Sequence, residues 1–417
     1  MSRYESYKNS EIDWVGEIPS HWETIKPKHK LNRVTRPIDD DDEVVTCFRD
    51  GVVTLRKNRR EDGFTNSIKE HGYQQINPGD LVVHEMDGFA GAIGISDSKG
   101  KSTPVYTVIE PDHRVDLRFI TYLLREMSKT GKIESLARSI RERTTDFRWN
   151  MWSVIHFPFP PVEEQKLISR YIDKKTEQID RLVEKIQKKI KLLKEQRTSL
   201  INHYVTKGLD PNVEMKDSGI EWIGEIPKHW KIIKTNLISE NLDGRRVPLN
   251  AVERDSIKGD IPYWGSNNIV DYINDYIFDE TLVLVGEDGS PFFERDKPVS
   301  FVTSGKVWIN NHIHVLRPKE NVISEWLSES FNIVDYKEFI TGSTRDKLTQ
   351  SDLNRIPHVV PPIDEQRLIC STLLKRKELI NKIIKLESIH IEKLKEYRQS
   401  LISSVVTGKV RVTEDMV

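Results

Sequence analysis

The sequence predicts an α+β protein with two small globular domains separated by two long helices, which pair as an antiparallel intramolecular coiled coil. Three observations predict this fold: a tryptophan-containing motif that occurs twice, a Pro-Pro junction that occurs twice, and two long segments without glycine or proline. The 417 residues suit two or three domains of about 100–200 residues each. The duplication predicts a pseudo-two-fold relation between two copies of one plan.

The tryptophan-containing segment, called the Trp motif below, opens each copy. Residues 8–22 read KNSEIDWVGEIPSHW, and residues 216–230 read KDSGIEWIGEIPKHW. The Pro-Pro junction follows later, as PPVEEQKLI at 160–168 and PPIDEQRLI at 361–369. Between these motifs the copies show no convincing residue-by-residue match. Duplicated motifs around dissimilar sequences are expected if one scaffold carries two different recognition surfaces. They are also expected if the sequences diverged by drift after a structural duplication.

Each long helix is expected to start at a Pro-Pro junction. Residues 162–206 and 363–407 contain neither glycine nor proline, and Gly208 and Gly408 follow them. Proline before a helix and glycine after it are start and stop signals. The chain therefore divides into a first variable domain (1–160), a long helix (161–208), a second variable domain (209–361), and a long helix with a C-terminal tail (362–417).

Apolar residues recur at heptad spacing along both helices and predict a seam. Lysine, glutamate and glutamine crowd the other faces, so pairing of the helices with each other is favoured over separate packing on two cores. Glu387 interrupts the second seam, which indicates a local gap or a paired polar contact. The expected seam residues are Ile172, Ile179, Ile186, Leu193, Leu200, Leu373, Ile380, Leu394 and Leu401.

Both variable domains are expected to mix strands and helices. Short runs rich in β-branched residues predict strands, and apolar residues at helical spacing predict one helix in each domain. The first domain has expected strands at 43–48, 79–86 and 105–111 and a helix at 117–127. The second has expected strands at 281–286, 299–303 and 312–318 and a helix at 323–331.

The composition limits which partners and which cellular location the protein can have. With 64 Lys+Arg against 65 Asp+Glu the formal charge is −1, so affinity for nucleic acid would need local basic patches. Cys47 and Cys370 are the two cysteines, which excludes a disulfide scaffold and suits a reducing cytoplasm. The first residues lack the apolar core of a signal peptide, and no apolar run approaches the ~18 residues of a membrane span. We therefore expect a soluble, cytoplasmic protein.

Basic and amide-bearing clusters are the candidate DNA contacts. Arginine and lysine bind phosphates and guanine edges, asparagine binds adenine, and serine or threonine binds either. One cluster lies at the matching place in both copies, just before the Pro-Pro junction. In the first domain the candidates are Arg56, Lys57, Arg59, Arg60, Arg141, Arg143, Thr144, Thr145 and Arg148. In the second they are Arg245, Arg246, Ser266, Asn267, Asn268, Ser343, Thr344, Arg345 and Lys347.

Catalytic signatures are absent from the sequence: it has no Walker motif, no H-E-x-x-H and no G-x-S-x-G. The glycines of FAGAIG (89–94) are spaced unlike a methyl-donor loop, and the charged segment 286–297 is interpreted as a turn between strands. His312 and His314 have no third ligand in view, so we expect packing or pairing rather than zinc binding. No catalytic, cofactor or metal site is expected in this chain.

The duplicated Trp motif, W-[IV]-G-x-I-P-x-x-W, and the duplicated PP-[VI]-[ED]-E-Q-x-L-I opening of a long helix resemble the specificity subunit of bacterial type I restriction-modification systems. The resemblance covers nearly the whole chain. It implies that residues 23–159 and 231–360 are two target-recognition domains, each binding one half of a bipartite, asymmetric double-stranded DNA target. It also implies that the helices are spacers that fix the gap and dock two modification subunits.

The resemblance further implies that catalysis belongs to partners. The modification subunits would be adenine-N6 methyltransferases using S-adenosylmethionine, and separate motor/restriction subunits would use ATP and Mg to translocate and cut DNA. Two alternatives stay open: a self-contained DNA-modifying or DNA-cleaving enzyme, and a coiled-coil adaptor without a DNA role.

Overall fold

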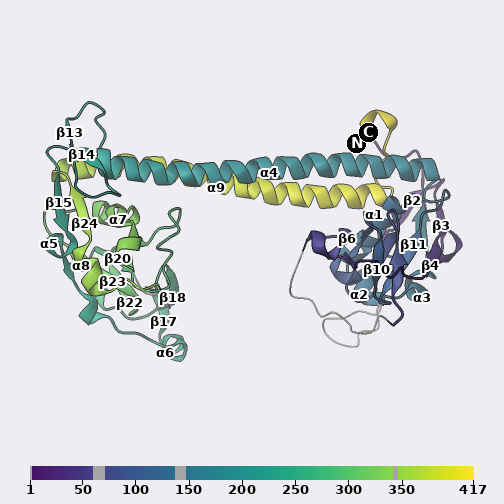
Figure 1. Ribbon diagram of the computed structural model, residues 1–417, viewed down its shortest axis with the longest axis horizontal. Coiled ribbons are helices and arrows are strands. Elements are labelled where there is room, and N and C mark those ends of the chain that lie inside the picture. The colour runs from purple at the N-terminus through teal and green to yellow at the C-terminus, as the bar shows by residue number, and fades with distance from the viewer. Residues whose placement is uncertain (1, 60–70, 137–146, 341–345) are drawn as a thin grey trace. The chain divides into compact units, whose positions relative to one another are not determined.

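The computed structural model describes residues 2–59, 71–136, 147–340 and 346–417. The chain divides into two compact units: unit 1 comprises Met1–Glu184 and His390–Val417, and unit 2 comprises Lys185–Ile389. Each unit contains a globular α+β region and a part of both long helices (Figure 1). Each long helix is therefore divided between the two units, and each part is grouped with the globular region that it contacts. Each unit is described here by itself.

Unit 1 is organised around an antiparallel sheet with the strand order β4-β11-β8-β9. Helix α1 (Leu117–Lys129) packs against β8 and β9. The short helices are α2 (Lys132–Leu136) and α3 (Trp149–Trp152). The strands are β1 (Tyr7–Asn9), β2 (Glu17–Pro19), β3 (Glu23–Ile25), β4 (Asn32–Val34), β5 (Val45–Cys47), β6 (Val53–Leu55), β7 (Gln74–Ile76), β8 (Leu81–His84), β9 (Ile93–Ile95), β10 (Gly100–Ser102), β11 (Tyr106–Glu110) and β12 (Phe157–Phe159).

Unit 2 repeats this plan with the strand order β16-β23-β20-β21. Helix α7 (Ser324–Asn332) packs on β20 and β21, as α1 does on β8 and β9. The short helices are α5 (Thr235–Ile238), α6 (Ala251–Ser256) and α8 (Gln350–Arg355). The strands are β13 (Met215–Asp217), β14 (Glu225–Pro227), β15 (Lys231–Lys234), β16 (Ser239–Asn241), β17 (Lys258–Trp264), β18 (Ile269–Ile273), β19 (Phe278–Asp279), β20 (Leu282–Gly286), β21 (Ser300–Thr303), β22 (Lys306–Ile309), β23 (Ile313–Pro318) and β24 (Pro357–Val360).

The domains differ in what is added to the shared sheet. Unit 1 adds the pairs β5-β6 and β7-β10, whereas unit 2 adds a sheet with the order β18-β17-β22-β19. Each addition has its own apolar cluster, with Val45 and Tyr106 in unit 1 and Phe278 and Leu284 in unit 2. This difference explains why the Trp motif and the Pro-Pro junction are duplicated while the sequences between them do not match.

The long helices are α4 (Val162–Lys207) and α9 (Ile363–Val406), and they pack against each other. In unit 1, Arg398 lies 3.5 Å from Asp180. In unit 2, Lys189 lies 2.5 Å from Glu387 and Arg197 donates to Asn381. As the residue number rises along α4 it falls along α9, so the pair is antiparallel, which confirms the predicted fold class.

Six of the nine predicted seam residues are buried, and the other three are half-buried. Ile172, Ile179 and Ile186 of α4 are buried, and so are Leu373, Ile380 and Leu401 of α9. Leu193, Leu200 and Leu394 are half-buried. At the interrupted position, Glu387 forms the paired polar contact with Lys189.

The Trp motif of each unit contacts one long helix, and the contact is the same in both units. In unit 1 the indole of Trp22 donates to Glu164 of α4 at 3.1 Å, and His21 contacts the same carboxylate at 2.8 Å. In unit 2 Trp230 donates to Glu365 of α9 at 3.0 Å, and His229 contacts it at 2.9 Å. Trp22 and Trp230 are fully buried. The motif is thus repeated because it makes the same structural contact twice.

The predicted strands and helices of both variable domains are found, with boundaries shifted by a few residues. His312 is a correction: it lies just before β23 and not within the strand. Strands β12 and β24 lie directly before the Pro-Pro junctions and pair with β3 and β15. They were not predicted, because Pro158 and Pro357 argue against a strand interior. Among the described helices, none is long and apolar enough to cross a membrane.

Candidate nucleic-acid interface

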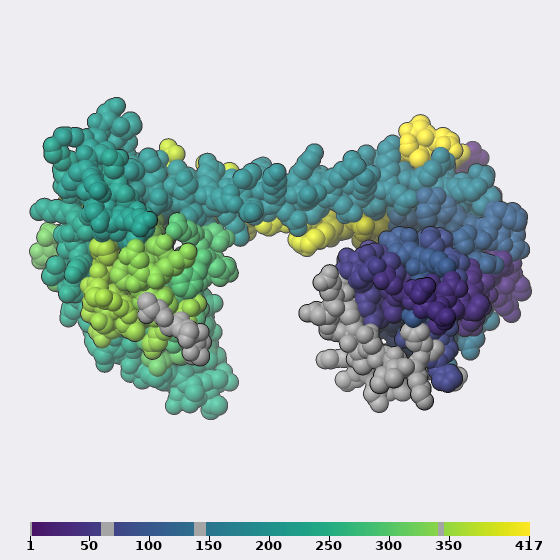
Figure 2. Space-filling view, viewed as in Figure 1, coloured from purple at the N-terminus to yellow at the C-terminus, as the bar shows by residue number. Residues whose placement is uncertain are grey.

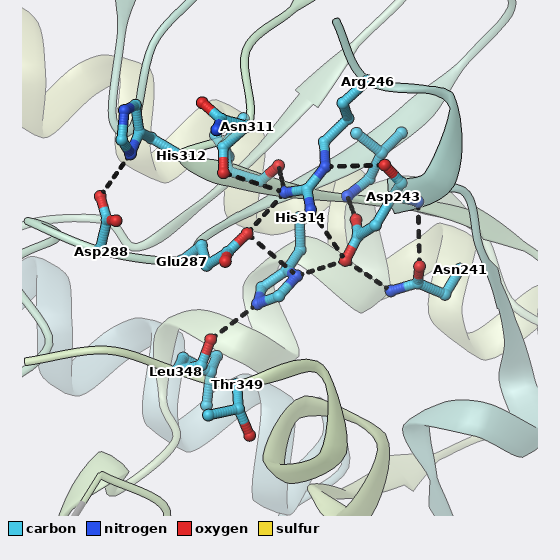
Figure 3. A network of polar contacts seen from close by, with 12 residues as sticks. Asn241, Asp243, Arg246, Glu287, Asp288, Asn311, His312, His314, Leu348 and Thr349 are labelled. Carbon is cyan, nitrogen blue, oxygen red and sulfur yellow. Dashed lines mark hydrogen bonds and ion pairs between the residues drawn. The ribbon is translucent and has the colours of Figure 1, made fainter. Parts of the chain in front are cut away.

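One end of the unit 2 sheet carries a set of charged side chains, called here the unit 2 network: Asp243, Arg246, Glu287 and His314 (Figure 3). Glu287 directly follows β20, His314 lies on β23, and Asp243 begins the 3-10 helix η4 (Asp243–Arg245) after β16. The side chain of His314 is 1% exposed, and the two acids are 7% and 12% exposed. Polar groups buried to this degree must satisfy one another.

Both ring nitrogens of His314 face oxygen atoms. Nε2 lies 2.9 Å from the carbonyl oxygen of Leu348, and Nδ1 lies 2.6 Å from Oδ2 of Asp243. Burial acts to raise the pKa of Asp243, but the hydrogen bond from His314 and the charges of His314 and Arg246 outweigh it, so this pKa is lowered. A carbonyl and an ionised carboxylate can only accept, so each ring nitrogen of His314 faces a hydrogen-bond acceptor.

Glu287 ties the network to the polar segment before the second Pro-Pro junction. Its Oε2 accepts from Arg246 at 2.6 Å, and its Oε1 lies 3.1 Å from Nζ of Lys347. Its backbone carbonyl accepts from the N–H of Leu348 at 2.8 Å. Arg246 also donates to the carbonyl of Ile313 at 2.8 Å, and its side chain is only 13% exposed. Arg246 is therefore held inside the domain, while Lys347 is half exposed.

Asp243, Glu287 and His314 could in principle hold a metal ion, because one ligand atom from each lies within 4.8 Å of the others. Those atoms already have donors: Asp243 accepts from His314 and from Asn241, and Glu287 accepts from Arg246. A cation here would have to replace the contact between His314 and Asp243 and lie beside a guanidinium. The donor set therefore fits an ion-paired network better than a metal centre. His312, half exposed, pairs separately with Asp288 at 2.9 Å.

The amide cluster of unit 2 lies against the same loop. Asn267 donates to the carbonyl of Gly289 at 3.0 Å and accepts from Ser290 at 2.5 Å. Ser266 is half-buried and Asn268 is exposed. Arg245 stacks over Phe278, 4.5 Å from the ring centre. The structure thus brings the candidates Arg246, Asn267 and Lys347 together around residues 287–290, which begin the loop after β20.

Unit 1 has the same arrangement at the corresponding end of its sheet. Glu85 directly follows β8, its backbone carbonyl accepts from the N–H of Phe147 at 2.9 Å, and its carboxylate accepts from Thr107 at 3.0 Å. Arg148 lies 3.9 Å from Glu85, with its side chain 62% exposed. Thr107 is fully buried on β11. A buried glutamate therefore joins the central strand to the polar segment in both domains.

The remaining candidates of unit 1 are on a separate part of its surface. Arg56 contacts Thr46, Lys57 pairs with Glu43 at 2.5 Å, and Arg59 pairs with Asp50 at 2.7 Å. Lys57 and Arg59 stay exposed in their surface ion pairs, and such pairs contribute little energy. The other candidates lie outside the described residues: Arg60, Arg141, Arg143, Thr144, Thr145, Ser343, Thr344 and Arg345.

Comparison with known proteins finds similarity to type I restriction enzyme specificity subunits. Residues 227–396 match the family model described as the type I restriction modification DNA specificity domain. A putative type I restriction enzyme MjaX specificity subunit of Methanocaldococcus jannaschii is 22% identical over 98% of this chain and 97% of its own length. A putative specificity subunit of Haemophilus influenzae is 35% identical over 33% of this chain and 34% of its own length. The chain is thus similar to type I restriction enzyme specificity subunits over nearly its whole length.

Solved structures support the fold of the type I specificity subunit. The HsdS subunit from Thermoanaerobacter tengcongensis is similar with a TM-score of 0.56 over 94% of this chain and 98% of that one, at 13% identity. A chain from a structure of the assembly and conformational transition of a type I R-M system has a TM-score of 0.68, covering 94% and 99%, at 12% identity. The relatives are named as specificity subunits and not as methyltransferases or nucleases.

Sequence reasoning missed the acids of the interface. Glu85, Glu287 and Asp243 were not singled out, because an isolated glutamate or aspartate is usually solvated surface. A signal was nevertheless present: HEMDG (84–88) and GEDG (286–289) each place a glutamate before Asp-Gly at the end of an apolar strand. That short similarity becomes meaningful only once β8 and β20 are known to occupy the same place in their sheets.

Proposed function

We propose that this type I specificity subunit recognises a bipartite, asymmetric double-stranded DNA target, with one half read by each of its two sheet domains. The observation that carries the proposal is the repeated sheet, β4-β11-β8-β9 and β16-β23-β20-β21, furnished with different additions. The shared sheet suits one binding geometry for both domains, and the different added strands suit two different base preferences. Its work on DNA would place it in the cytoplasm.

The proposed reading surface combines phosphate and base contacts. Arg148 and Lys347 are exposed cations at equivalent ends of the two domains, and Asn268 is an exposed amide beside the unit 2 loop. Cations bind phosphates or guanine, and an amide matches adenine. The candidates of the same polar segments that lie outside the described residues, such as Arg143 and Arg345, remain part of the proposal. Arg246 is assigned a supporting role because its side chain is mostly buried.

We propose that two modification subunits dock on the long helices, and that motor/restriction subunits join the same complex. Methyl transfer with S-adenosylmethionine, and DNA translocation and cleavage with ATP and Mg, would belong to those subunits. The specificity subunit would recognise the DNA target and assemble the complex, without catalysing a reaction itself. Target adenines must leave the base stack to be methylated, and the partner's pocket would receive them.

Helix α9 offers a docking face in unit 2. Leu368, Leu379 and Leu386 are 58%, 60% and 56% exposed, and spacings of 11 and 7 residues are about three and two helical turns. Lys375 and Lys382 lie on the same face and are exposed, so the surface fits a partner with acidic groups around an apolar patch. Figure 2 shows that the outer face of α4, in teal, is also open in that view.

Replacing Leu379 and Leu386 together by serine should weaken binding of the modification subunit at least ten-fold, because two apolar contacts are lost from the proposed face. Leu374→Ser is the matched control: this leucine is also 58% exposed but points to another side of α9. The measurement is a titration of modification subunit onto the variants. Equal binding by the double variant and the control would remove this face from the interface.

Sequencing of modified bases in cellular DNA, with and without this gene, tests the proposed function. We expect one bipartite motif with methylated adenines to vanish on deletion. Methylation or cleavage by the purified chain alone, with S-adenosylmethionine or magnesium, would instead favour the self-contained enzyme. An unchanged methylation pattern on deletion would favour the coiled-coil adaptor.

A further inference from the structure

Glu85 and Glu287 occupy the same position in two domains that lack overall sequence similarity. In unit 1 the N–H of Glu85 donates to Val105 at 2.9 Å, and in unit 2 that of Glu287 donates to His312 at 3.1 Å. Each N–H thus continues the ladder of the central strand with β11 or β23 by one residue. The same register makes Thr107 the counterpart of His314, and both side chains are buried.

We propose that Glu85 and Glu287 are positioning residues that orient the DNA-contacting cations of their own domain, and so help to set its base preference. The inference rests on the proposed DNA-reading function and adds to it two residues that do not themselves need to touch DNA. The cations are Arg148 in unit 1 and Lys347, supported by Arg246, in unit 2.

Each glutamate contacts the polar segment twice. Its backbone carbonyl accepts from Phe147 or Leu348, which fixes the segment, and its carboxylate lies beside Arg148 or Lys347, which directs the cation. Both carboxylates have 12% side-chain exposure, whereas the cations are 62% and 51% exposed. In unit 2 the buried acid contacts a half-exposed cation, so the ammonium group of Lys347 can still donate to a ligand.

The support behind each carboxylate differs between the domains. A neutral hydroxyl, that of Thr107, donates to Glu85. In unit 2 the guanidinium of Arg246 donates to Glu287, and Nδ1 of His314 lies 3.9 Å away. The backbone placement is thus shared, while the described groups that donate to the carboxylate differ. Two domains with the same anchoring acid can therefore present their cations differently and prefer different bases.

The carboxylate also influences which contacts the cation makes. A negative charge beside Arg148 or Lys347 offsets part of the attraction to any phosphate, which carries no sequence information. Geometry-dependent contacts with base edges are then a larger fraction of the binding free energy. Removing the charge should increase non-specific binding and reduce discrimination between sequences, and this combination is not expected from loss of packing alone.

The test uses the complete complex of this chain with its modification subunits. Rates of adenine methylation are measured on DNA libraries in which one half of the target, then the other, is randomised. Glu287→Gln keeps the size of the side chain and removes its charge. We expect discrimination to fall at least ten-fold at one half of the target only, and Glu85→Gln should affect the other half only.

Two further variants separate positioning from folding. Lys347→Met removes an exposed cation, so folding should be unaffected, and it should lower discrimination at the same half as Glu287→Gln. Because both act through one contact, the double variant should lose little more than the larger single effect. Glu240→Gln, at an exposed acid paired with Arg317, is the matched control and should keep full discrimination.

The inference is overturned if either glutamine variant lowers discrimination equally at both halves, since that indicates damage to assembly or folding. It is also overturned if both variants keep full discrimination. A wild-type complex with no bipartite target would instead contradict the proposed function, so the two failures are distinguishable.

Discussion

His358, on β24 directly before the second Pro-Pro junction, is a buried side chain whose surroundings favour the neutral form. Its ring nitrogens contact the hydroxyls of Thr235 at 2.9 Å and Ser330 at 2.7 Å, and Phe331 packs edge-on against it. Burial lowers its pKa to about 3. Hydroxyls can donate or accept, so the neutral ring is satisfied and a charged ring would lack a counter-ion.

This residue should make unit 2 sensitive to acid. Its pKa is near 6.5 when unfolded and about 3 when folded, so between those values the unfolded state binds more protons. The stabilisation is complete above pH 6.5 and is lost as the pH falls, by at most about 1.4 kcal/mol per pH unit. In His358→Gln the unfolding free energy should depend less on pH between 6 and 4.5, measured by thermal or urea unfolding. His156→Gln, at an exposed position, should keep the wild-type slope.

At the scale of elements, the ends of the long helices are set by glycines in the left-handed region. Gly208 and Gly408 both have φ of +76°, as expected for a glycine just after a helix. A Cβ at Gly408 would overlap Pro19 and lie 3.1 Å from Trp22, and one at Gly208 would lie 3.1 Å from Trp230. The glycine thus permits both the end of the helix and the approach of the Trp motif.

Gly408→Ala should therefore destabilise unit 1 by more than backbone strain alone. An alanine in this region costs about 1–2 kcal/mol, and the overlap with Pro19 should add about 1–3 kcal/mol. Gly16→Ala is the matched control in the same unit: its φ is +75° and no atom lies within 4 Å of the added Cβ. Equal losses for the two variants in denaturant unfolding would show that the close approach is unimportant.

Glu387, at a seam position of α9, pairs with Lys189 of α4, and the side chains are 56% exposed for Lys189 and 17% for Glu387. A desolvated carboxylate recovers little of its hydration energy from an exposed lysine, and apolar replacement of buried ion pairs is often neutral or stabilising. Glu387→Leu should raise the free energy of unfolding by about 1 kcal/mol in calorimetry. The exposed Glu392→Leu should change it little. A lower stability for Glu387→Leu would mean that the pair is a net stabilising contact.

At the scale of the whole molecule, the length of α4 and α9 is proposed to set the gap between the two half-targets. Removing two heptads from each helix shortens it by about 21 Å at 1.5 Å per residue, or about six base pairs at 3.4 Å each. We expect a correspondingly shorter gap in the methylated motif, or a complex that no longer assembles. An unchanged gap, read by modified-base sequencing, would contradict the spacer role.

Much of the fold follows from local signals. Pro161 and Gly208 bound α4, and Pro362 and Gly408 bound α9, because proline and glycine act on the backbone of their immediate neighbours. The candidate interface was only partly predictable. The polar segments with Arg148 and Lys347 were identified by residue type, whereas Arg246 proved largely buried. The residue type alone does not show whether an arginine side chain faces solvent or an internal carboxylate.

The sequence by itself determined the duplication, the two long helices, their seam and the family resemblance, since these are written in periodicity and in motifs of a few residues. Only the tertiary structure decided the strand order, the contact of each Trp motif with its helix, and the equivalence of Glu85 and Glu287. Those features depend on pairing between strands that are distant in sequence, and register between such strands is set by the packing of the whole sheet.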